Sequence, residues 1–187
     1  MNNVLDCKNR EEFREWLSKH SQREGECYLL LKRGKPKDDN AFYYIDAVEE
    51  ALCFGWIDST MKRIDGVTYQ RFSPRKKNGL WTELNKERVR RLEKLSLMTD
   101  LGRAVLPDMN AEFKLDEEIE AAIKEAGVWS TYKSFPPLYQ RVRAYNLKFY
   151  KDKLPAQYRK SLANFIEKTK EGNTYGEWND YGRLLDY

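Results

Sequence analysis

The sequence has little of what metal and redox sites are built from. His20 is the only histidine among 187 residues, and Cys7, Cys27 and Cys53 are the only cysteines and form no CxxC pair. A histidine-rich metal site and a second catalytic histidine are therefore excluded, and we expect neither a metal nor a cofactor. An odd number of cysteines is typical of a reducing compartment rather than of a disulfide framework, which predicts a cytoplasmic protein.

Long apolar runs and a strong net charge are also lacking. No run approaches the roughly 18 apolar residues of a membrane span, and the first residues resemble no signal peptide, so we expect neither feature. Lys and Arg number 34 against 30 Asp and Glu, a net charge of only +4. Bulk charge therefore does not predict nucleic-acid binding. The sequence does not indicate an oligomeric state.

What the sequence does have is a mixture of 41% hydrophobic and 34% charged residues, typical of a folded domain with a charged surface. Strand patterns are confined to residues 27–75. Helical patterns cover residues 10–20, 44–54, 81–97 and 116–126, and two further helices begin at Pro136-Pro137 and Pro155. This order predicts an α+β fold in which a small antiparallel or mixed sheet with a hairpin is packed by helices. Residues 1–110 would form this module and residues 111–187 a helical extension that packs on it to make one compact unit.

The segment Gly55–Arg75 is predicted to be a β-hairpin that turns at Asp65-Gly66, because Asp-Gly favours a type I′ turn. If no residue interrupts the pairing, the numbers of paired residues sum to 131. This register places Trp56 opposite Arg75, Asp58 opposite Ser73 and Thr60 opposite Arg71. Side-chain alternation then separates a polar face from a core face that carries Ile57, Met61 and Phe72.

The polar face is the first candidate for a functional site. Guanidinium groups bind carboxylates and phosphates, so this face predicts an anion or peptide site. Asp58 is the candidate acid or base, because it can orient the cations or accept a proton. The interpretation without a function is a solvated hairpin in which Asp58 pairs with an arginine. The predicted ligand-binding residues are Trp56, Asp58, Lys62, Arg71, Ser73 and Arg75, with Trp81 as a second wall.

Two other candidates are weaker. The basic run from Arg71 to Arg91 could contact nucleic acid, but glutamates interrupt it and it contains no recognised motif, so a solvated helix is favoured. Cys53 could act as a nucleophile with His20. Its place at a helix C-terminus disfavours a thiolate, so a core cysteine is favoured.

Several stretches of the chain together form a long pattern. They are AVEEALCFGWIDS at residues 47–59, QRFSPR at residues 70–75, and the single residues Trp81, Asn85, Arg88, Val89, Met98 and Gly102. This pattern resembles the YdeI/OmpD-associated family, also called the bacteriocin-protection family. The resemblance covers about residues 10–106. It implies a small cytosolic bacterial protein linked to envelope stress, and it brings no reaction, cofactor or catalytic residues. Residues 128–187 depart from the family's usual helical ending.

The combined interpretation is a soluble protein of the bacteriocin-protection type that binds a small anion or a peptide on the polar hairpin face. The residues do not decide whether it is an enzyme, and we favour a non-enzymatic role. The first alternative is an enzyme that acts on an anionic substrate with Asp58 as acid or base. The second is a nucleic-acid-binding accessory protein.

Overall fold

A computed structural model of the chain describes residues 3–37 and 39–187, and it has the predicted α+β fold. The chain divides into two compact units. Residues 1–80, 88–109 and 187 form the first, which we call the sheet unit. Residues 81–87 and 110–186 form the second, which we call the helical unit. One division falls inside helix α3 (Glu83–Lys94), where no sequence pattern indicated a boundary.

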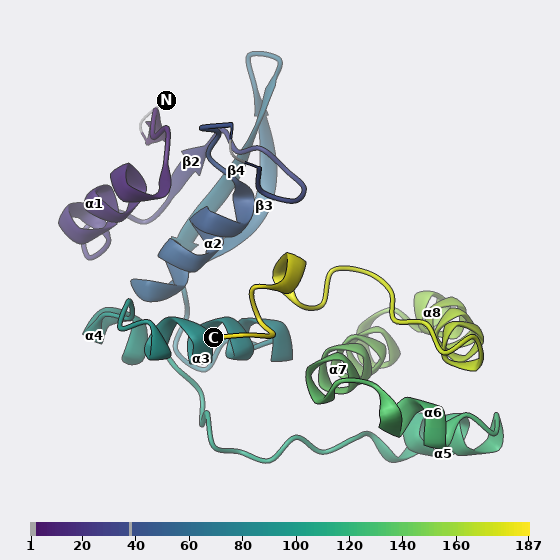
Figure 1. Ribbon diagram of the computed structural model, residues 1–187. Coiled ribbons are helices and arrows are strands. Elements are labelled where there is room, and N and C mark those ends of the chain that lie inside the picture. Colours follow the sequence, from purple (N-terminus) through teal and green to yellow (C-terminus); the bar gives the residue numbers. More distant parts are fainter. Residues whose placement is uncertain (1–2, 38) are drawn as a thin grey trace. The chain divides into compact units, whose positions relative to one another are not determined.

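The sheet unit contains a four-stranded mixed sheet with the order β1-β2-β4-β3. β1 pairs with β2 in parallel, whereas β2 with β4 and β4 with β3 are antiparallel. The hairpin of β3 and β4 extends well beyond β2 (Figure 1). The strands are β1 (Val4–Leu5), β2 (Cys27–Leu29), β3 (Trp56–Ile64) and β4 (Val67–Pro74). The predicted strand at residue 27 and the hairpin are confirmed, and β1 was not predicted.

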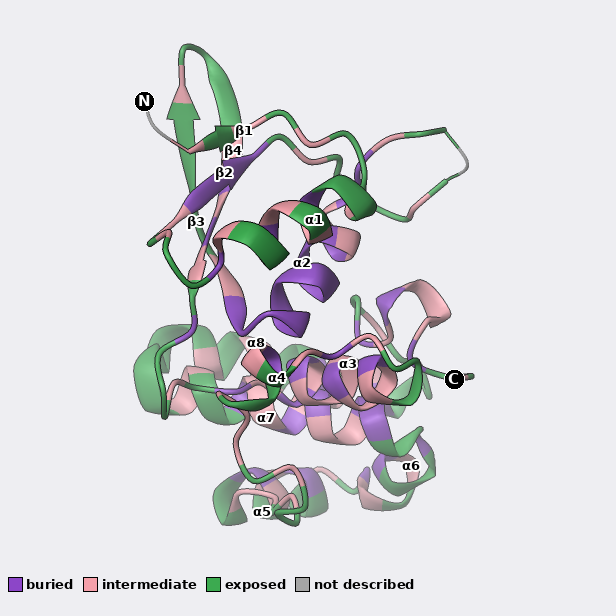
Figure 2. Cartoon of the chain, turned by 90° about the vertical axis from the view of Figure 1, so that its left-hand side faces the viewer, coloured by how far each residue is buried: buried purple, intermediate pink, exposed green. Residues whose placement is uncertain are grey.

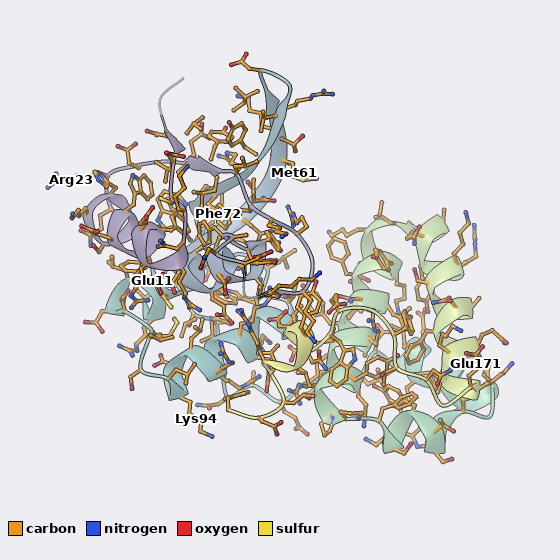
Figure 3. The ribbon with its side chains drawn as sticks, turned by 45° about the horizontal axis from the view of Figure 1, so that its top comes forward. Glu11, Arg23, Met61, Phe72, Lys94 and Glu171 are labelled. Carbon is orange, nitrogen blue, oxygen red and sulfur yellow. The ribbon has the colours of Figure 1, made fainter. Side chains whose placement is uncertain are left out.

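Two helices cover one face of this sheet. In α1 (Arg10–His20), the Asn9 side chain caps the helix by accepting a hydrogen bond from the backbone N–H of Glu12. Phe13 of α1 is fully buried, and its ring centroid lies 5.5 Å from that of Phe72 on β4. The second helix, α2 (Tyr44–Cys53), is buried along most of its length (Figure 2). Figure 3 shows Phe72 among these side chains and Met61 pointing away from them.

The end of α2 lies against the short helix α4 (Asp100–Arg103) with almost no space between their backbones. A Cβ atom added to Gly102 would lie 2.4 Å from the carbonyl oxygen of Cys53. Thr99 caps α4, and both its hydroxyl and its backbone N–H donate to that same carbonyl, at 2.6 and 3.1 Å. Gly55 follows the C-terminal end of α2 and has a positive φ of 73°, which glycine adopts without strain.

Buried acidic side chains of α2 are neutralised by arginines from other helices. Glu49 and Glu50 have side-chain exposures of 0% and 2%. Arg14 donates to Glu50 at 2.7 Å, and Arg91 of α3 donates to Glu49 at 2.8 Å. Arg10 donates hydrogen bonds to both carboxylates, those of Glu49 and Glu50. Buried carboxylates need such partners, so this network fixes how the helices pack.

The helical unit has its own core, built mainly from α7 (Pro137–Lys153) and the helices around it. Its other elements are α5 (Glu117–Glu125), α6 (Trp129–Ser134), α8 (Pro155–Lys170) and a 3₁₀ turn at Asp180–Gly182. The predicted helices at 116–126, Pro136-Pro137 and Pro155 are confirmed, whereas α6 and the 3₁₀ turn were not predicted. The fully buried core residues are Ile119, Ile123, Tyr139 and Phe165.

Candidate functional site

The tip of the hairpin has the predicted geometry. Asp65 and Gly66 have positive φ values of 48° and 83°, as both central residues of a type I′ turn must. Next to the turn, Ile64 pairs with Val67 and Lys62 with Tyr69, in the predicted register. The Asp-Gly signal therefore fixed this half of the hairpin correctly.

Beyond Met61 the predicted register is wrong, because β3 contains a bulge. Ser59 and Thr60 together oppose Arg71, so Asp58 pairs with Phe72 instead of Ser73. Trp56 accordingly pairs with Pro74 and not with Arg75. A bulge leaves backbone groups outside the ladder, and side chains of β4 take them up here. Gln70 Nε2 donates to the carbonyl oxygen of Ser59 at 2.7 Å, and Arg71 Nη1 donates to Ser59 Oγ at 3.0 Å.

The bulge moves the first half of β3 to the opposite face from the one predicted. Asp58 shares the helix-covered face with Phe72, whereas Arg71 and Ser73 point to the other face. Trp56 is 1% exposed, and its indole N–H donates to the carbonyl oxygen of Ser21. Ile57, predicted to face the core, pairs with Ser73 instead. Asp58 and Arg71 therefore do not converge on one face.

On the outer face, the predicted cations are engaged by the protein itself. Arg71 Nε donates to Glu26 Oε2 at 2.7 Å, and this bond lowers the pKa of the Glu26 carboxyl. The Lys62 ammonium lies 5.4 Å from the centre of the Tyr28 ring. Ser73 is half-buried on the same face. The outer face is therefore charge-paired, but through Glu26 and Arg71 and not through the Asp58–arginine pair of the alternative interpretation.

The last two predicted residues are not part of the strands that form this face. Arg75 follows β4, is 6% exposed, and donates from Nη1 to the carbonyl oxygen of Leu80 at 2.9 Å. Trp81 is buried and belongs to the helical unit, not to the sheet unit. Cys53 is fully buried, as the core interpretation predicted, and burial raises the pKa of its thiol to about 11. His20 stacks on Trp16 with 5.2 Å between ring centroids.

The structure brings Asp58 together with a different set of side chains. Tyr44 of α2 donates its hydroxyl proton to Asp58 Oδ2 at 2.6 Å. The guanidinium carbon of Arg33 lies 3.8 Å above the centre of the Tyr44 ring. Arg33 Nη2 donates to Gln70 Oε1 at 2.6 Å. We call Arg33, Tyr44, Asp58 and Gln70 the Arg33 cluster.

A small pocket of about 210 Å³ opens beside the Arg33 cluster. Arg33 and Gln70 line it, and the hairpin adds Met61, Thr68 and Tyr69. Met61 is 62% exposed, so its side chain is accessible to a ligand at the pocket. The pocket thus combines a fixed cation, a hydroxyl group and an apolar wall. The sequence indicated Gln70 only as a polar residue on the core face, and nothing in it singled out Arg33.

The hydrogen bond between Tyr44 and Asp58 predicts an altered alkaline titration. Burial and the Asp58 carboxylate raise the pKa of Tyr44 to about 12. Because the folded state holds the proton more tightly, this contribution to stability is complete below pH ~10 and is lost between there and about 12. We expect Asp58→Asn to lower the pKa of Tyr44, since it removes the negative charge that opposes the phenolate. Phenolate absorbance, with Tyr44→Phe subtracted, measures the change. An unchanged pKa would contradict the contact.

Comparison with known proteins places the sheet unit in a family. Residues 5–105 match a family described as a domain of unknown function, DUF8412, and because this is more than half of the chain, the protein belongs to that family. No curated protein matches the chain. No solved structure matches it either. The matched residues include the whole Arg33 cluster.

Two further findings concern the part of the chain that the structure describes. None of its helices is long and apolar enough to cross a membrane. No group of three or more His, Cys, Asp and Glu side chains within residues 3–37 and 39–187 is placed to hold a metal ion.

Proposed function

We propose that the sheet unit is a binding module for a small ligand that carries a carboxylate or a phosphate, and that Arg33 holds this group. The observation that carries the proposal is the fixed position of the Arg33 guanidinium between Tyr44 and Gln70. A guanidinium that is stacked and hydrogen-bonded on one side is already ordered for a bidentate contact. Less side-chain entropy is then lost when an anion binds.

The contacts of Arg33 leave part of its donor set available. Only Nη2 forms a hydrogen bond within the described residues, to Gln70. The guanidinium carries five N–H donors, so the remaining ones can reach an anion from the pocket. Thr68 can add a hydroxyl donor, and Met61 gives an adaptable apolar contact. These features support an organic anion, such as the acidic end of a peptide, over a bare inorganic ion.

The proposal keeps the predicted class of ligand and changes the predicted residues. Arg71 pairs with Glu26, so an anion on the outer face would compete with a carboxylate already in place. The enzyme alternative depended on Asp58 and Arg71 acting together, and the register separates them. The likeness to the bacteriocin-protection family and a cytosolic location stay predictions.

A thermal-shift screen with carboxylates and phosphate monoesters tests this function. A ligand at many times its Kd stabilises the folded protein by a few kcal/mol, which raises the melting temperature by several degrees. We expect Arg33→Ala to abolish the shift, because it removes the group that binds the anion. Lys35→Ala is the matched control, since it removes the same charge from the same exposed loop.

Three outcomes would contradict the proposal. The first is the absence of a shift with every anion. The second is an equal loss of the shift in Lys35→Ala, which would indicate bulk electrostatics. The third is a shift that Arg71→Ala abolishes and Arg33→Ala leaves unchanged, which would place the ligand on the outer face of the hairpin.

A further inference from the structure

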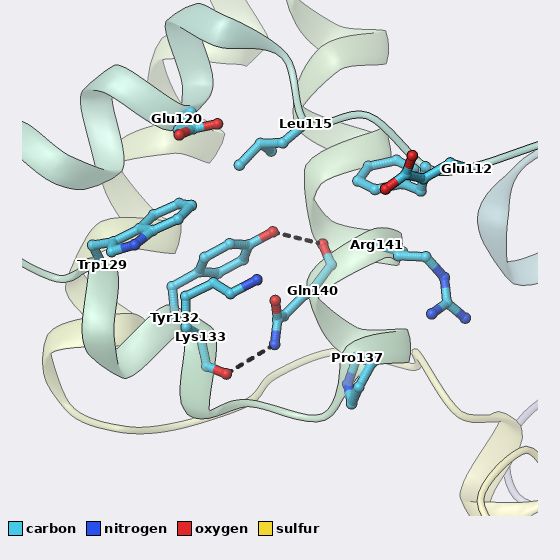
Figure 4. Close-up of a pocket in the computed structure, with 10 residues that line it drawn as sticks. Glu112, Leu115, Glu120, Trp129, Tyr132, Lys133, Pro137, Gln140 and Arg141 are labelled. Carbon is cyan, nitrogen blue, oxygen red and sulfur yellow. Dashed lines mark hydrogen bonds between the residues drawn. The ribbon is translucent and has the colours of Figure 1, made fainter.

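The helical unit contains a larger pocket than the one beside Arg33. None of the residues that line this pocket lies within residues 5–105, the part of the chain that matches the family. The pocket volume is about 410 Å³, within the range of roughly 300 to 1,000 Å³ typical of small-molecule sites. Segments from before α5, from α6 and from the start of α7 surround it (Figure 4). The apolar part of its lining is Phe113, Leu115, Trp129, Tyr132 and Pro137.

Hydrogen bonds between α6 and α7 hold this pocket open in a defined shape. The Tyr132 hydroxyl donates to the carbonyl oxygen of Gln140 at 3.3 Å. In return, Gln140 Nε2 donates to the carbonyl oxygens of Lys133 and Phe135 at 3.1 and 2.7 Å. Tyr132 is only 2% exposed, and its ring packs edge-on against Phe165 of the core. The wall is therefore formed before any ligand arrives.

Most charged groups of the lining already have partners within the helical unit. Glu120 accepts from Lys124 at 2.6 Å, and Arg141 donates to Glu87 at 2.9 Å. Lys133 differs, because among the described residues it forms no ion pair and only lies 5.7 Å from the centre of the Trp129 ring. Glu112 likewise forms no ion pair in that part of the chain, and Figure 4 shows it across the pocket from Trp129.

We propose that this pocket binds a small molecule made of a flat apolar ring and a carboxylate. The ring would pack against Trp129, Tyr132 and Leu115, which offer aromatic and aliphatic surface. The carboxylate would lie at the Lys133 ammonium and away from Glu112, whose charge repels it. The site is independent of the Arg33 pocket, because different residues line the two.

The surroundings of Trp129 favour a carboxylate over an amine as the charged group. Two ammonium groups, of Lys124 and Lys133, already lie 4.9 and 5.7 Å from the centre of its ring. Glu120 neutralises Lys124, so Lys133, which forms no ion pair among the described residues, decides the preference: it repels a ligand cation and attracts an anion. Burial, aided by the charge of Glu120, raises the pKa of Tyr132 to about 12, so this phenol adds no negative charge at neutral pH.

Calorimetric titration of the full chain with three matched probes tests the proposal. The probes are 3-phenylpropanoate, its neutral amide and 3-phenylpropylamine, which share a ring and differ in charge. We expect the carboxylate to bind most tightly. We expect Lys133→Met to weaken its binding about tenfold, a typical effect of losing a charged hydrogen bond. Lys160→Met removes the same charge from an exposed position outside the pocket and is expected to change nothing.

A second variant keeps the test decisive. Trp129→Leu removes the stacking surface and is expected to abolish binding of all three probes, with helix content checked by circular dichroism. Arg33→Ala is expected to leave binding unchanged, which separates this site from the Arg33 pocket. The proposal is overturned if no probe binds, if the amine binds more tightly than the carboxylate, or if Lys160→Met weakens binding as much as Lys133→Met. Binding that survives both Trp129→Leu and Lys133→Met would also overturn it.

Discussion

Gly102→Ala is expected to destabilise the sheet unit by ~3 kcal/mol or more, near the upper end of what overpacking costs. The added methyl carbon would lie 2.4 Å from Cys53 O and 2.8 Å from Leu52 O, both inside the van der Waals contact distance of carbon and oxygen. Both oxygens belong to the backbone at the end of α2, so no flexible side chain can move aside. Relief requires α4 to separate from α2, which would also break the two hydrogen bonds from Thr99 to Cys53.

Denaturant unfolding followed by circular dichroism measures this effect. Gly25→Ala is the matched control, because no atom lies within 4 Å of its would-be Cβ and its φ is not positive. We expect it to be neutral or slightly stabilising, since alanine restricts the unfolded chain. If Gly102→Ala unfolded at the same denaturant concentration as Gly25→Ala, the close contact between α2 and α4 would be refuted.

Arg10→Met is expected to destabilise the protein by ~2 to 3 kcal/mol. Arg10 contacts both Glu49 and Glu50, whose side chains are 0% and 2% exposed, and its loss leaves each carboxylate with one fewer counter-charge. The expected cost lies below that of a fully buried pair, because the Arg10 side chain keeps 29% of its exposure. Methionine preserves much of the side-chain volume, so the change isolates charge from packing. Chemical denaturation with linear extrapolation gives the free energy.

The same helix supplies the control for this prediction. Lys19 pairs with Glu15 on the exposed side of α1, where both side chains are more than 60% exposed. Lys19→Met is expected to change the free energy of unfolding by less than about 0.5 kcal/mol, because solvent screens such pairs. In a double-mutant cycle, Arg10→Met together with Glu50→Gln should cost less than the sum of the two single changes. Strict additivity would show that the pair is not coupled.

Local signals in the sequence predicted most of the secondary structure, because the physics of helix ends and tight turns acts within a few residues. Asn9, Thr99 and Asp116 begin α1, α4 and α5, because the side chain of each accepts a hydrogen bond from the backbone N–H three residues further on. Asp65-Gly66 fixed the turn in the same way. Helix α6 has no side-chain cap, and it consequently left no signal at its start.

The candidate sites were predicted far less well, since they depend on contacts between distant residues. The bulge in β3 is stabilised by the side chain of Gln70, which alternation alone assigns only to a face. One extra residue was enough to move Asp58 from the Arg71 side to the Tyr44 side. The 410 Å³ pocket draws on three separate segments, and only its position in space unites them. No regular spacing in the sequence predicts that these three segments line one pocket.

The bulge at Ser59 and Thr60 has a consequence for how this family can diverge. It divides the hairpin into a base, where Trp56 and Phe72 are tied to the core, and an arm around Asp65-Gly66 that is largely exposed. Inserting one further cross-strand pair next to the turn would lengthen the arm. The contacts of the base would stay unchanged. Changes in the reach and chemistry of the arm therefore leave the buried contacts of the base unchanged. The hairpin thus combines a buried base that the core holds in place with an exposed tip that is free to vary.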